Sequence, residues 1–339
     1  MQNSRNLRAL LKSSSLALAL TIGVATGAEA GNPWEIISID AATTTVISIN
    51  GSSTILGKFF RADGIQHGFL QAPDGTVTTF DDPDAANATI PTAMSANGTV
   101  AGYLDNGAHG FIRDPKGNIQ TFDVPGTVGS TVARAINVQG TVIGDFQDGP
   151  ITTRGFLRAA DGTFETFAPP DATFVAPVAI NGHGTIAGVF NDSHGSEHAF
   201  VRNRLGRITV FDVPGATFTY ATGMNAAGEI VGGTDKNGFL REPDGTITTI
   251  DPSGSDFKGV QNSVVTSINY QGVITGCYWD KLSIVHGWVR NPSGTYFALD
   301  APGATNTCTA MIAPNGRIIG NADNTVGFRL NRRGWDNAN

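Results

Sequence analysis

The sequence predicts an all-β protein, a seven-bladed β-propeller built from four-stranded antiparallel blades. Three observations lead to this prediction. A unit of about 44 residues occurs seven times, each unit contains four short strand-like segments and no convincing amphipathic helix, and the first strand of the chain completes the last unit. The 43 glycines and the sparse charges, 15% of all residues, agree with a turn-rich β fold.

A glycine marks each copy of the repeat, at the end of a segment of the type Asn-Gly-x-Gly-x-Ile-x-Gly. The marker occurs at Gly57, Gly102, Gly144, Gly188, Gly232, Gly276 and Gly320. Seven residues before it stands an asparagine in five copies, which we expect to bond its own turn. The regular spacing makes one repeated structural unit the natural interpretation.

The second half of each unit contains an aromatic residue and, in most copies, an aspartate. The aromatic residues are Phe69, Phe111, Phe156, Phe200, Phe239, Trp288 and Phe328. We expect each of them to be a wedge packed between neighbouring blades. The aspartate follows twelve residues later, at Asp81, Asp123, Asp212, Asp251 and Asp300, with Ala168 in the third copy.

The fifth copy illustrates the four strands expected in each blade. They are TYATGM from 219, EIVGG from 229, GFLRE from 238 and TITTID from 246. The last two are joined by a turn of the type Pro-Asp-Gly, in which glycine supplies the positive φ of a tight hairpin.

The two ends of the chain are complementary. The last copy stops after its third strand, GFRLN, whereas the segment WEIISID at 34–40 resembles a fourth strand and aligns Asp40 with Asp300. We therefore expect an N-terminal strand to complete the last blade, which would leave no open sheet edge.

The first 30 residues have the pattern of a secretory signal peptide. Arg5, Arg8 and Lys12 precede an apolar run, and a small-residue stretch ends at Ala30, the expected cleavage site. The domain organisation expected is therefore a signal peptide at 1–30, one propeller domain at 31–332 and a C-terminal tail at 333–339. A secreted or periplasmic protein without a membrane span follows from this pattern.

The charge balance bears on the class of partner. Without the first 30 residues, which contain three bases and one acid, the chain has 19 basic and 28 acidic residues and a net charge of −9. This disfavours nucleic acid and anionic membranes as partners. We expect a monomer that binds an extracellular glycan or protein. The two cysteines, Cys277 and Cys308, either form a disulfide or are two buried apolar residues, and their spacing gives no zinc site.

The repeat resembles the HAF-type extracellular repeat family. His-Ala-Phe stands at 198–200, and His-Gly-Phe at 67–69 and 109–111, while Arg154, Asn237 and Val326 replace the histidine elsewhere. The resemblance covers nearly all of residues 34–330. It implies an exported repeat protein and supplies no catalytic residues.

Residues that recur in every blade are better explained by architecture than by chemistry. We expect His67, His109, His198 and His286 to be hydrogen-bonding residues at strand ends rather than metal ligands. We expect the recurring aspartate to accept backbone N–H bonds in the turn that follows it. The alternative is a ring of carboxylates that gathers a cation such as Ca²⁺, formed by Asp40, Asp81, Asp123, Asp212, Asp251 and Asp300. No other cofactor or metal is expected.

Function is expected where the repeat breaks. The first and third turns of each blade have constant length, whereas the second connection spans 7 to 12 residues from glycine to aromatic, and the link to the next blade 10 to 18. In antiparallel blades the two variable connections emerge on one face, where loops on a rigid scaffold usually bind. The short loop of the fifth blade between two long ones predicts a groove, walled by residues 251–267.

The candidate ligand-binding residues on that face are Asp192, His194, Glu197, Asp235, Asp256, Lys258, Tyr278, Trp279, Asp280 and Lys281. Tyr278 and Trp279 are placed to stack on sugar rings, while the carboxylates would bond hydroxyl groups. The alternative is that these are solvated loop residues, with one ordinary turn aspartate in each copy.

Arg134 is a further candidate. It occupies an inner-strand position that is uncharged in the other copies: Ile47, Thr92, Val178, Thr222, Thr266 and Ala310. It either pairs with a neighbouring carboxylate, which we favour, or meets an anion in the central channel.

The sequence contains no nucleophile elbow, phosphate loop or compact metal motif. The function expected is binding of a glycan or protein on the variable face. The alternative is an extracellular polysaccharide hydrolase or lyase that uses acid and base groups on the same face, because propellers host both.

Overall fold

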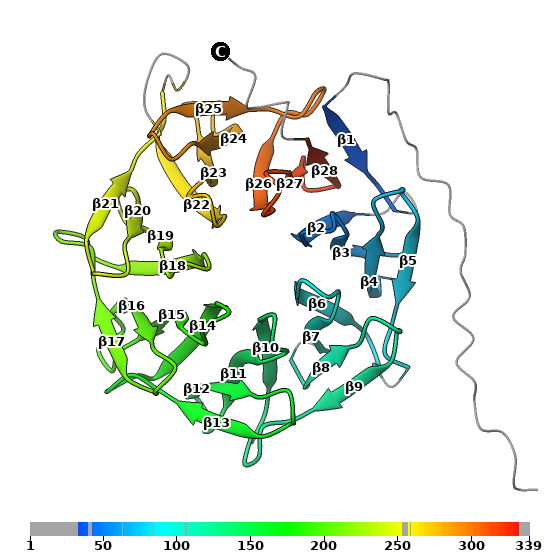
Figure 1. The fold of residues 1–339 in the computed structure, drawn as a ribbon, viewed down its shortest axis with the longest axis vertical. Helices are drawn as coiled ribbons and strands as arrows, with labels where there is room; N and C mark the ends of the chain where they lie inside the picture. The colour runs from blue at the N-terminus through cyan, green and yellow to red at the C-terminus, as the bar shows by residue number, and fades with distance from the viewer. Residues whose placement is uncertain are drawn as a thin grey trace, which may run out of the picture.

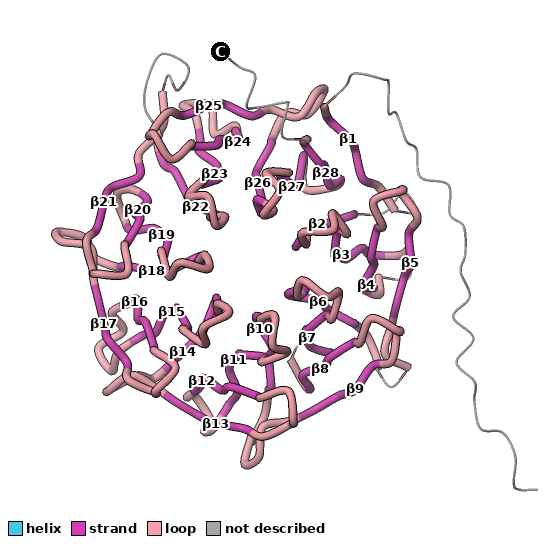
Figure 2. The backbone as a smooth tube through the Cα atoms, in the orientation of Figure 1, coloured by secondary structure: helices cyan, strands magenta, loops and turns pink. Residues whose placement is uncertain are grey.

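Seven four-stranded antiparallel sheets stand in a ring in the computed structural model, so the predicted seven-bladed propeller is confirmed (Figure 1). The structure describes residues 33–39, 43–62, 64–83, 85–105, 107–252, 257 and 259–331. Strands joined by loops make up this part of the chain (Figure 2). It contains no helix long and apolar enough to cross a membrane. The expected signal peptide and C-terminal tail lie outside the described residues.

Each blade uses its first strand at the centre of the ring and its fourth at the outer edge (Figure 1). Blade one has β2 (Thr44–Ile49), β3 (Ile55–Phe60), β4 (Gln66–Gln71) and β5 (Val77–Phe80), and blade two has β6 (Thr89–Met94), β7 (Val100–Leu104), β8 (His109–Arg113) and β9 (Ile119–Phe122). Blade three has β10 (Thr131–Ile136), β11 (Val142–Gln147), β12 (Thr153–Arg158) and β13 (Phe164–Phe167), and blade four has β14 (Phe174–Ile180), β15 (Ile186–Asn191), β16 (Glu197–Arg202) and β17 (Ile208–Phe211). Blade five has β18 (Thr219–Met224), β19 (Ile230–Thr234), β20 (Gly238–Arg241) and β21 (Ile247–Ile250). Blade six has β22 (Asn262–Ile268), β23 (Ile274–Trp279), β24 (Val285–Arg290) and β25 (Tyr296–Leu299), and blade seven has β26 (Thr307–Ile312), β27 (Ile318–Ala322), β28 (Val326–Leu330) and β1 (Trp34–Ile37).

The N-terminal strand closes the ring, as the sequence predicted. β1 pairs antiparallel with β28, with Trp34 opposite Leu330. Glu35 of β1 accepts hydrogen bonds from Arg329 in blade seven and from Gln71 in blade one, the latter at 3.3 Å. One side chain therefore ties the first and last blades together. Asp40 lies outside the described residues.

The recurring aromatic residue is the wedge between blades. All seven copies are fully buried, and Phe111 of blade two clusters with Leu56 and Phe80 of blade one. The marker glycine makes room for the wedge. At Gly144 an added Cβ would lie 1.9 Å from the Val132 carbonyl oxygen and 2.7 Å from a ring carbon of Phe156, so a side chain there would displace both.

The recurring asparagine stabilises the first turn of its blade, as expected. The Oδ1 of Asn137 accepts backbone N–H bonds from Gln139 and Thr141 at 3.1 and 3.0 Å. Its Nδ2 also donates to the carbonyl oxygen of Asn181, 44 residues later, at 3.2 Å. The same side chain therefore shapes a turn and links neighbouring blades.

The recurring aspartate has a different partner from the one we predicted. In four blades its carboxylate bonds the histidine Nδ1 of the adjacent third strand, at 2.8 to 3.0 Å, instead of turn N–H groups. The pairs are His67–Asp81, His109–Asp123, His198–Asp212 and His286–Asp300. The expectation that these histidines bond at strand ends is confirmed. Because each carboxylate follows the outermost strand of its own blade, the described aspartates do not converge on one cation.

Cys277 on β23 and Cys308 on β26 form a disulfide, with their Cα atoms 5.2 Å apart. Of the two alternatives for the cysteines, the covalent link is the one the structure contains. It joins blade six to blade seven.

Candidate functional site

The two kinds of variable connection meet on one face of the ring, which we call the variable face. Asp105, in the second connection of blade two, accepts backbone N–H bonds from Ala86, Asn87 and Ala88, which link blade one to blade two. Asp323 makes the same kind of bond to Asn306 at 2.8 Å, between blades six and seven. The predicted arrangement of the loops is therefore confirmed.

Three acidic candidates on this face shape loops. Asp192 and Asp280 each accept two backbone N–H bonds of their own loop, at 2.8 and 2.9 Å. Asp235 accepts one from Thr217 at 2.9 Å. Backbone hydrogen bonds are the main reason that the pKa of each carboxyl is lowered. For these three, the backbone hydrogen bonds agree with the alternative of an ordinary loop aspartate, and Asp192 and Asp280 also lie within 3.7 Å of a histidine.

The fifth blade, which has the shortest second connection, is flanked by two separate hollows, whereas we expected one groove. The blade four–five hollow has a volume of about 460 Å³ and is lined by Asn191, Gly195, Ser196, Glu197, Thr217 and Phe218. The blade five–six hollow has a volume of about 430 Å³ and is lined by Lys236, Asn237, Asp251, Pro252, Phe257, Gly259, Val260, Gln261, Asn262, Ser263 and Lys281. Among the candidates, Glu197 lines the first and Lys281 the second, so they do not form one site.

Tyr278 was wrongly predicted to stack on a sugar. It is buried, its ring stacks on His286 with centroids 5.0 Å apart, and Phe257 packs against its edge at 5.4 Å. A side chain that fills the core of blade six has no free face for a ligand. Tyr278 stands two residues after the marker glycine. Phe59 and Phe190 occupy the same position in blades one and four, and their rings also pack against a histidine, with centroids 5.2 and 5.3 Å apart.

The remaining loop candidates are scattered. Trp279 is half-buried at the end of β23, opposite Asn262, and the His194 side chain is 86% exposed beside Asp192. Asp256 and Lys258 lie outside the described residues. The described residues of the long connection between Asp251 and Ser263 line the blade five–six hollow, so the connection walls one of the two hollows and not a single groove.

An aromatic pair that we did not predict lies beside the blade four–five hollow. The rings of Phe218 and Tyr220 stack with centroids 6.1 Å apart and an interplanar angle of 27°, and Phe218 is 37% exposed. Tyr220 leans over Gly233, where an added Cβ would lie 2.5 Å from the phenol oxygen. Any larger residue at that position would move the ring.

The acid at this hollow is electrostatically coupled to the phenol. Burial raises the pKa of the Glu197 carboxyl. Burial also raises the pKa of Tyr220, and the negative charge of Glu197 raises it further. The hollow therefore combines a partly desolvated carboxyl group, a phenol and an exposed aromatic face.

This combination is particular to one boundary between blades. Where Tyr220 stands, the other copies have Thr45, Ile90, Val132, Ala176, Val264 and Cys308. Where Gly233 stands, they have Lys58, Tyr103, Asp145, Val189, Cys277 and Asn321. A large aromatic residue opposite a glycine, found in one copy of the repeat, is therefore the sequence feature that indicates this site. The loop lengths do not indicate it.

Arg134 pairs with a neighbouring carboxylate, as favoured from the sequence. Its Nε donates to Oδ1 of Asp145 on β11. The Asp145 side chain is only 6% exposed, and burial raises the pKa of its carboxyl against the opposing effect of the arginine.

Comparison with known proteins gives structural likeness only. No family model matches the sequence, and no curated protein matches it significantly. A streptogramin B lyase structure has a TM-score of 0.59 at 13% identity, covering 88% of this chain and 97% of that one. A virginiamycin B lyase from Staphylococcus aureus, solved with quinupristin, has a TM-score of 0.62 at 12% identity, covering 88% and 98%.

A puromycin hydrolase is similar over part of its length. Its structure has a TM-score of 0.59 at 15% identity, and the match covers 84% of this chain and 50% of that one. At such identities the likeness concerns the fold alone. The chain is a seven-bladed β-propeller whose fold is also found in these enzymes.

Proposed function

We propose that this chain is an exported binding protein that takes a glycan in the blade four–five hollow. The observation that carries the proposal is the exposed ring of Phe218, stacked on the half-buried Tyr220 and placed in the same hollow as the Glu197 carboxyl group. The resemblance to the HAF-type extracellular repeats and the signal-peptide pattern support an extracellular role.

The chemistry of the hollow suits a sugar. The apolar C–H face of a pyranose packs against an exposed aromatic ring, while a carboxylate accepts hydrogen bonds from adjacent hydroxyl groups. The negative charge expected for the exported chain, −9, disfavours a polyanionic polysaccharide. Neutral or basic glycans are the class we propose.

Replacing Phe218 by alanine tests the proposal. A glycan array would first select a ligand, whose affinity for the wild type and Phe218→Ala would then be measured by titration calorimetry. We expect the substitution to weaken binding about tenfold, which corresponds to about 1.4 kcal/mol of lost stacking.

Phe174→Ala is the matched control. Phe174 occupies the equivalent position one blade earlier and is 38% exposed, but Ala176 replaces the stacked tyrosine there, and Thr153 replaces the acid. The control should bind as the wild type does. Equal affinities of wild type and Phe218→Ala, or equal losses in both variants, would contradict the proposal.

A hydrolase or lyase acting on polysaccharides is the second candidate. The direction of the Glu197 pKa shift favours it, because burial raises the pKa of this carboxyl and a general acid for a leaving glycosidic oxygen needs a raised pKa. Release of new reducing ends or unsaturated products, abolished in Glu197→Gln while binding is retained, would establish this function. Binding without any product would leave the binding function.

A further inference from the structure

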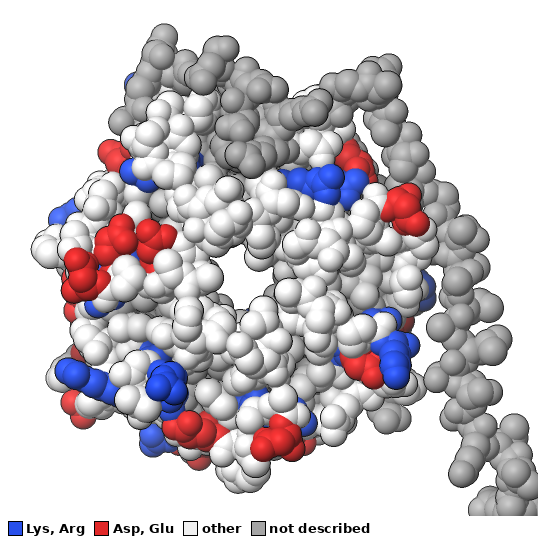
Figure 3. All heavy atoms as spheres, in the orientation of Figure 1, with Lys and Arg blue, Asp and Glu red and all other residues white. Residues whose placement is uncertain are grey.

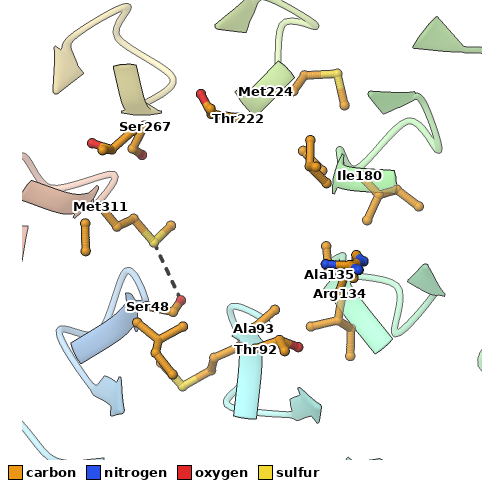
Figure 4. Close-up of a pocket in the computed structure, with 18 of the residues that line it drawn as sticks. Ser48, Thr92, Ala93, Arg134, Ala135, Ile180, Thr222, Met224, Ser267 and Met311 are labelled. Atoms are coloured by element: carbon orange, nitrogen blue, oxygen red, sulfur yellow. Dashed lines mark hydrogen bonds between the residues drawn. The ribbon is translucent and has the colours of Figure 1, made fainter. Parts of the chain in front are cut away.

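The centre of the ring contains a cavity of about 280 Å³ that is lined by the inner strands (Figure 4). Every inner strand has a β-bulge at the position compared with Arg134 above, and the residue at that position lines the cavity in all seven blades. The next residue is small in six of the seven blades: Ser48, Ala93, Ala135, Ala179, Gly223 and Ser267. These small residues create the space.

The cavity is open and almost uncharged. Figure 3 shows an opening at the centre of the ring, surrounded mainly by residues other than Lys, Arg, Asp and Glu. Among the described residues that line the cavity, Arg134 alone is charged, and much of the rest is apolar, including Ile180, Met224 and Met311. A ligand in this cavity would meet one cation and apolar walls.

The ion pair at this cavity is not required by the architecture. Both members break the repeat, because no other blade has an arginine at the position of Arg134 or a carboxylate at that of Asp145. Six blades form the same strands with uncharged residues at the first position. Burying the Asp145 carboxylate costs desolvation energy that the uncharged residues of most other blades avoid.

Arg134 still has donors to offer. Its Nε bonds Asp145, and within the described residues Nη1 and Nη2 donate to no other group. Two threonine hydroxyl groups that line the cavity already donate to backbone: Thr92 to the Ala133 carbonyl oxygen at 2.9 Å, and Thr222 to that of Val231 at 3.3 Å. The guanidinium side chain is 36% exposed at the cavity (Figure 4). Its fork suits a carboxylate, which accepts two parallel bonds.

We propose that the central cavity binds a small organic carboxylate, whose anionic head is held by Arg134 and whose apolar body packs on the methionine and isoleucine side chains of the channel. This site lies on the ring axis and is separate from the blade four–five hollow, so either site can fail its test without the other.

The test uses straight-chain alkanoates from acetate to octanoate, titrated calorimetrically into the protein. We expect affinity to rise roughly fourfold for each methylene group until the cavity is full. Hexylammonium has a similar chain and the opposite charge, and it should not compete with hexanoate.

Arg134→Thr/Asp145→Val is the decisive variant. Removing the arginine alone would leave a buried, unpaired carboxylate and endanger folding. The double variant removes both charges and installs residues that blades two and four carry, Thr92 and Val189. It should melt cooperatively and lose at least about tenfold in hexanoate affinity, the loss of a charge-assisted bidentate contact.

Three results would overturn the proposal. They are no binding of any alkanoate by the wild type at millimolar concentration, hexylammonium competing as well as its anionic counterpart, and unchanged hexanoate affinity in the folded double variant. Binding of alkanoates by the wild type, together with its loss in the folded double variant, would support it.

Discussion

His198 lies between two carboxylates. Its Nδ1 is 3.0 Å from Asp212, and its Nε2 is 3.6 Å from Asp192. Burial alone would lower the pKa of this imidazole, but the hydrogen bonds and charges of the two aspartates outweigh burial, and the pKa is raised. The folded chain therefore holds a proton on this ring more tightly than the unfolded chain does.

This histidine should make stability depend on pH. Because the folded-state pKa is raised, its contribution is complete below the unfolded value of about 6.5 and disappears as pH rises through the folded value. We expect the melting temperature of the wild type to exceed that of His198→Asn at pH 5, with the difference shrinking above neutrality. Blade five has Asn237 at this position, so the variant suits the fold.

Melting curves of both proteins between pH 5 and pH 9 would check this. A difference in melting temperature that stays constant over the range would mean that the ring acts through packing on Phe190, 5.3 Å away, and not through its charge.

At the scale of single residues, the sequence predicted well which positions recur in each blade. It predicted less well which groups those residues contact. The bonding of the recurring asparagine followed from local turn chemistry, and the backbone bonds of Asp192 and Asp280 agree with the turn role given as their alternative. The partner of Asp212 did not, because it depends on the register between β16 and β17, which places the histidine beside the aspartate. Tyr278 was misjudged because a side chain at a strand end can point into the core or toward solvent.

At the scale of elements, the disulfide joins β23 to β26 across a boundary between blades. It closes a loop between residues 31 apart in sequence, which in the chain-entropy account corresponds to about 3 to 4 kcal/mol. The bond adds to the burial between blades six and seven, where Leu299 and Ile312 share a core cluster.

Removing this bond should weaken the protein measurably. We expect Cys277→Ser/Cys308→Ser to lower the free energy of unfolding in urea by about 3 kcal/mol relative to the oxidised wild type. The reduced wild type is the matched comparison and should behave like the double variant. If the oxidised and reduced wild types unfold at the same urea concentration, the bond does not contribute in this way.

The order of the strands and the pairing within blades were predictable, because the period of 44 residues, the hairpin glycines and the strand patterns all agree on one unit. The two hollows were not predictable from loop lengths. They depend on where individual side chains pack, as Tyr220 packs over Gly233 of the adjacent strand.

At the scale of the whole molecule, the ring depends on Glu35. Its side chain is 18% exposed and pairs with Arg329, which is 11% exposed, while also bonding Gln71 of blade one. Without the acid, a guanidinium group would remain buried without its charged partner.

We expect Glu35→Gln to lower the free energy of unfolding by about 3 kcal/mol, as when one partner of a buried ion pair is removed. Glu165→Gln is the comparison, since Glu165 pairs with the buried Arg202 in the same way but is itself 57% exposed. Arg202 is only 2% exposed and would also lose its charged partner, so both variants should lose stability in urea. The larger loss is expected for Glu35→Gln, because Glu35 also links blade seven to blade one. Equal losses would mean that ring closure adds nothing to the pair.

The pairing of β1 with β28 also sets the order of folding events. Glu35 and Arg329 are 294 residues apart in sequence, so the last blade can form only after nearly the whole domain has been synthesised. Until then six blades can assemble. The first strand has no partner during this time, because β28 has not yet been synthesised. Contacts between such distant segments form slowly, and open strands aggregate. A chaperone that shields the N-terminal strand during synthesis would therefore increase the yield of closed rings.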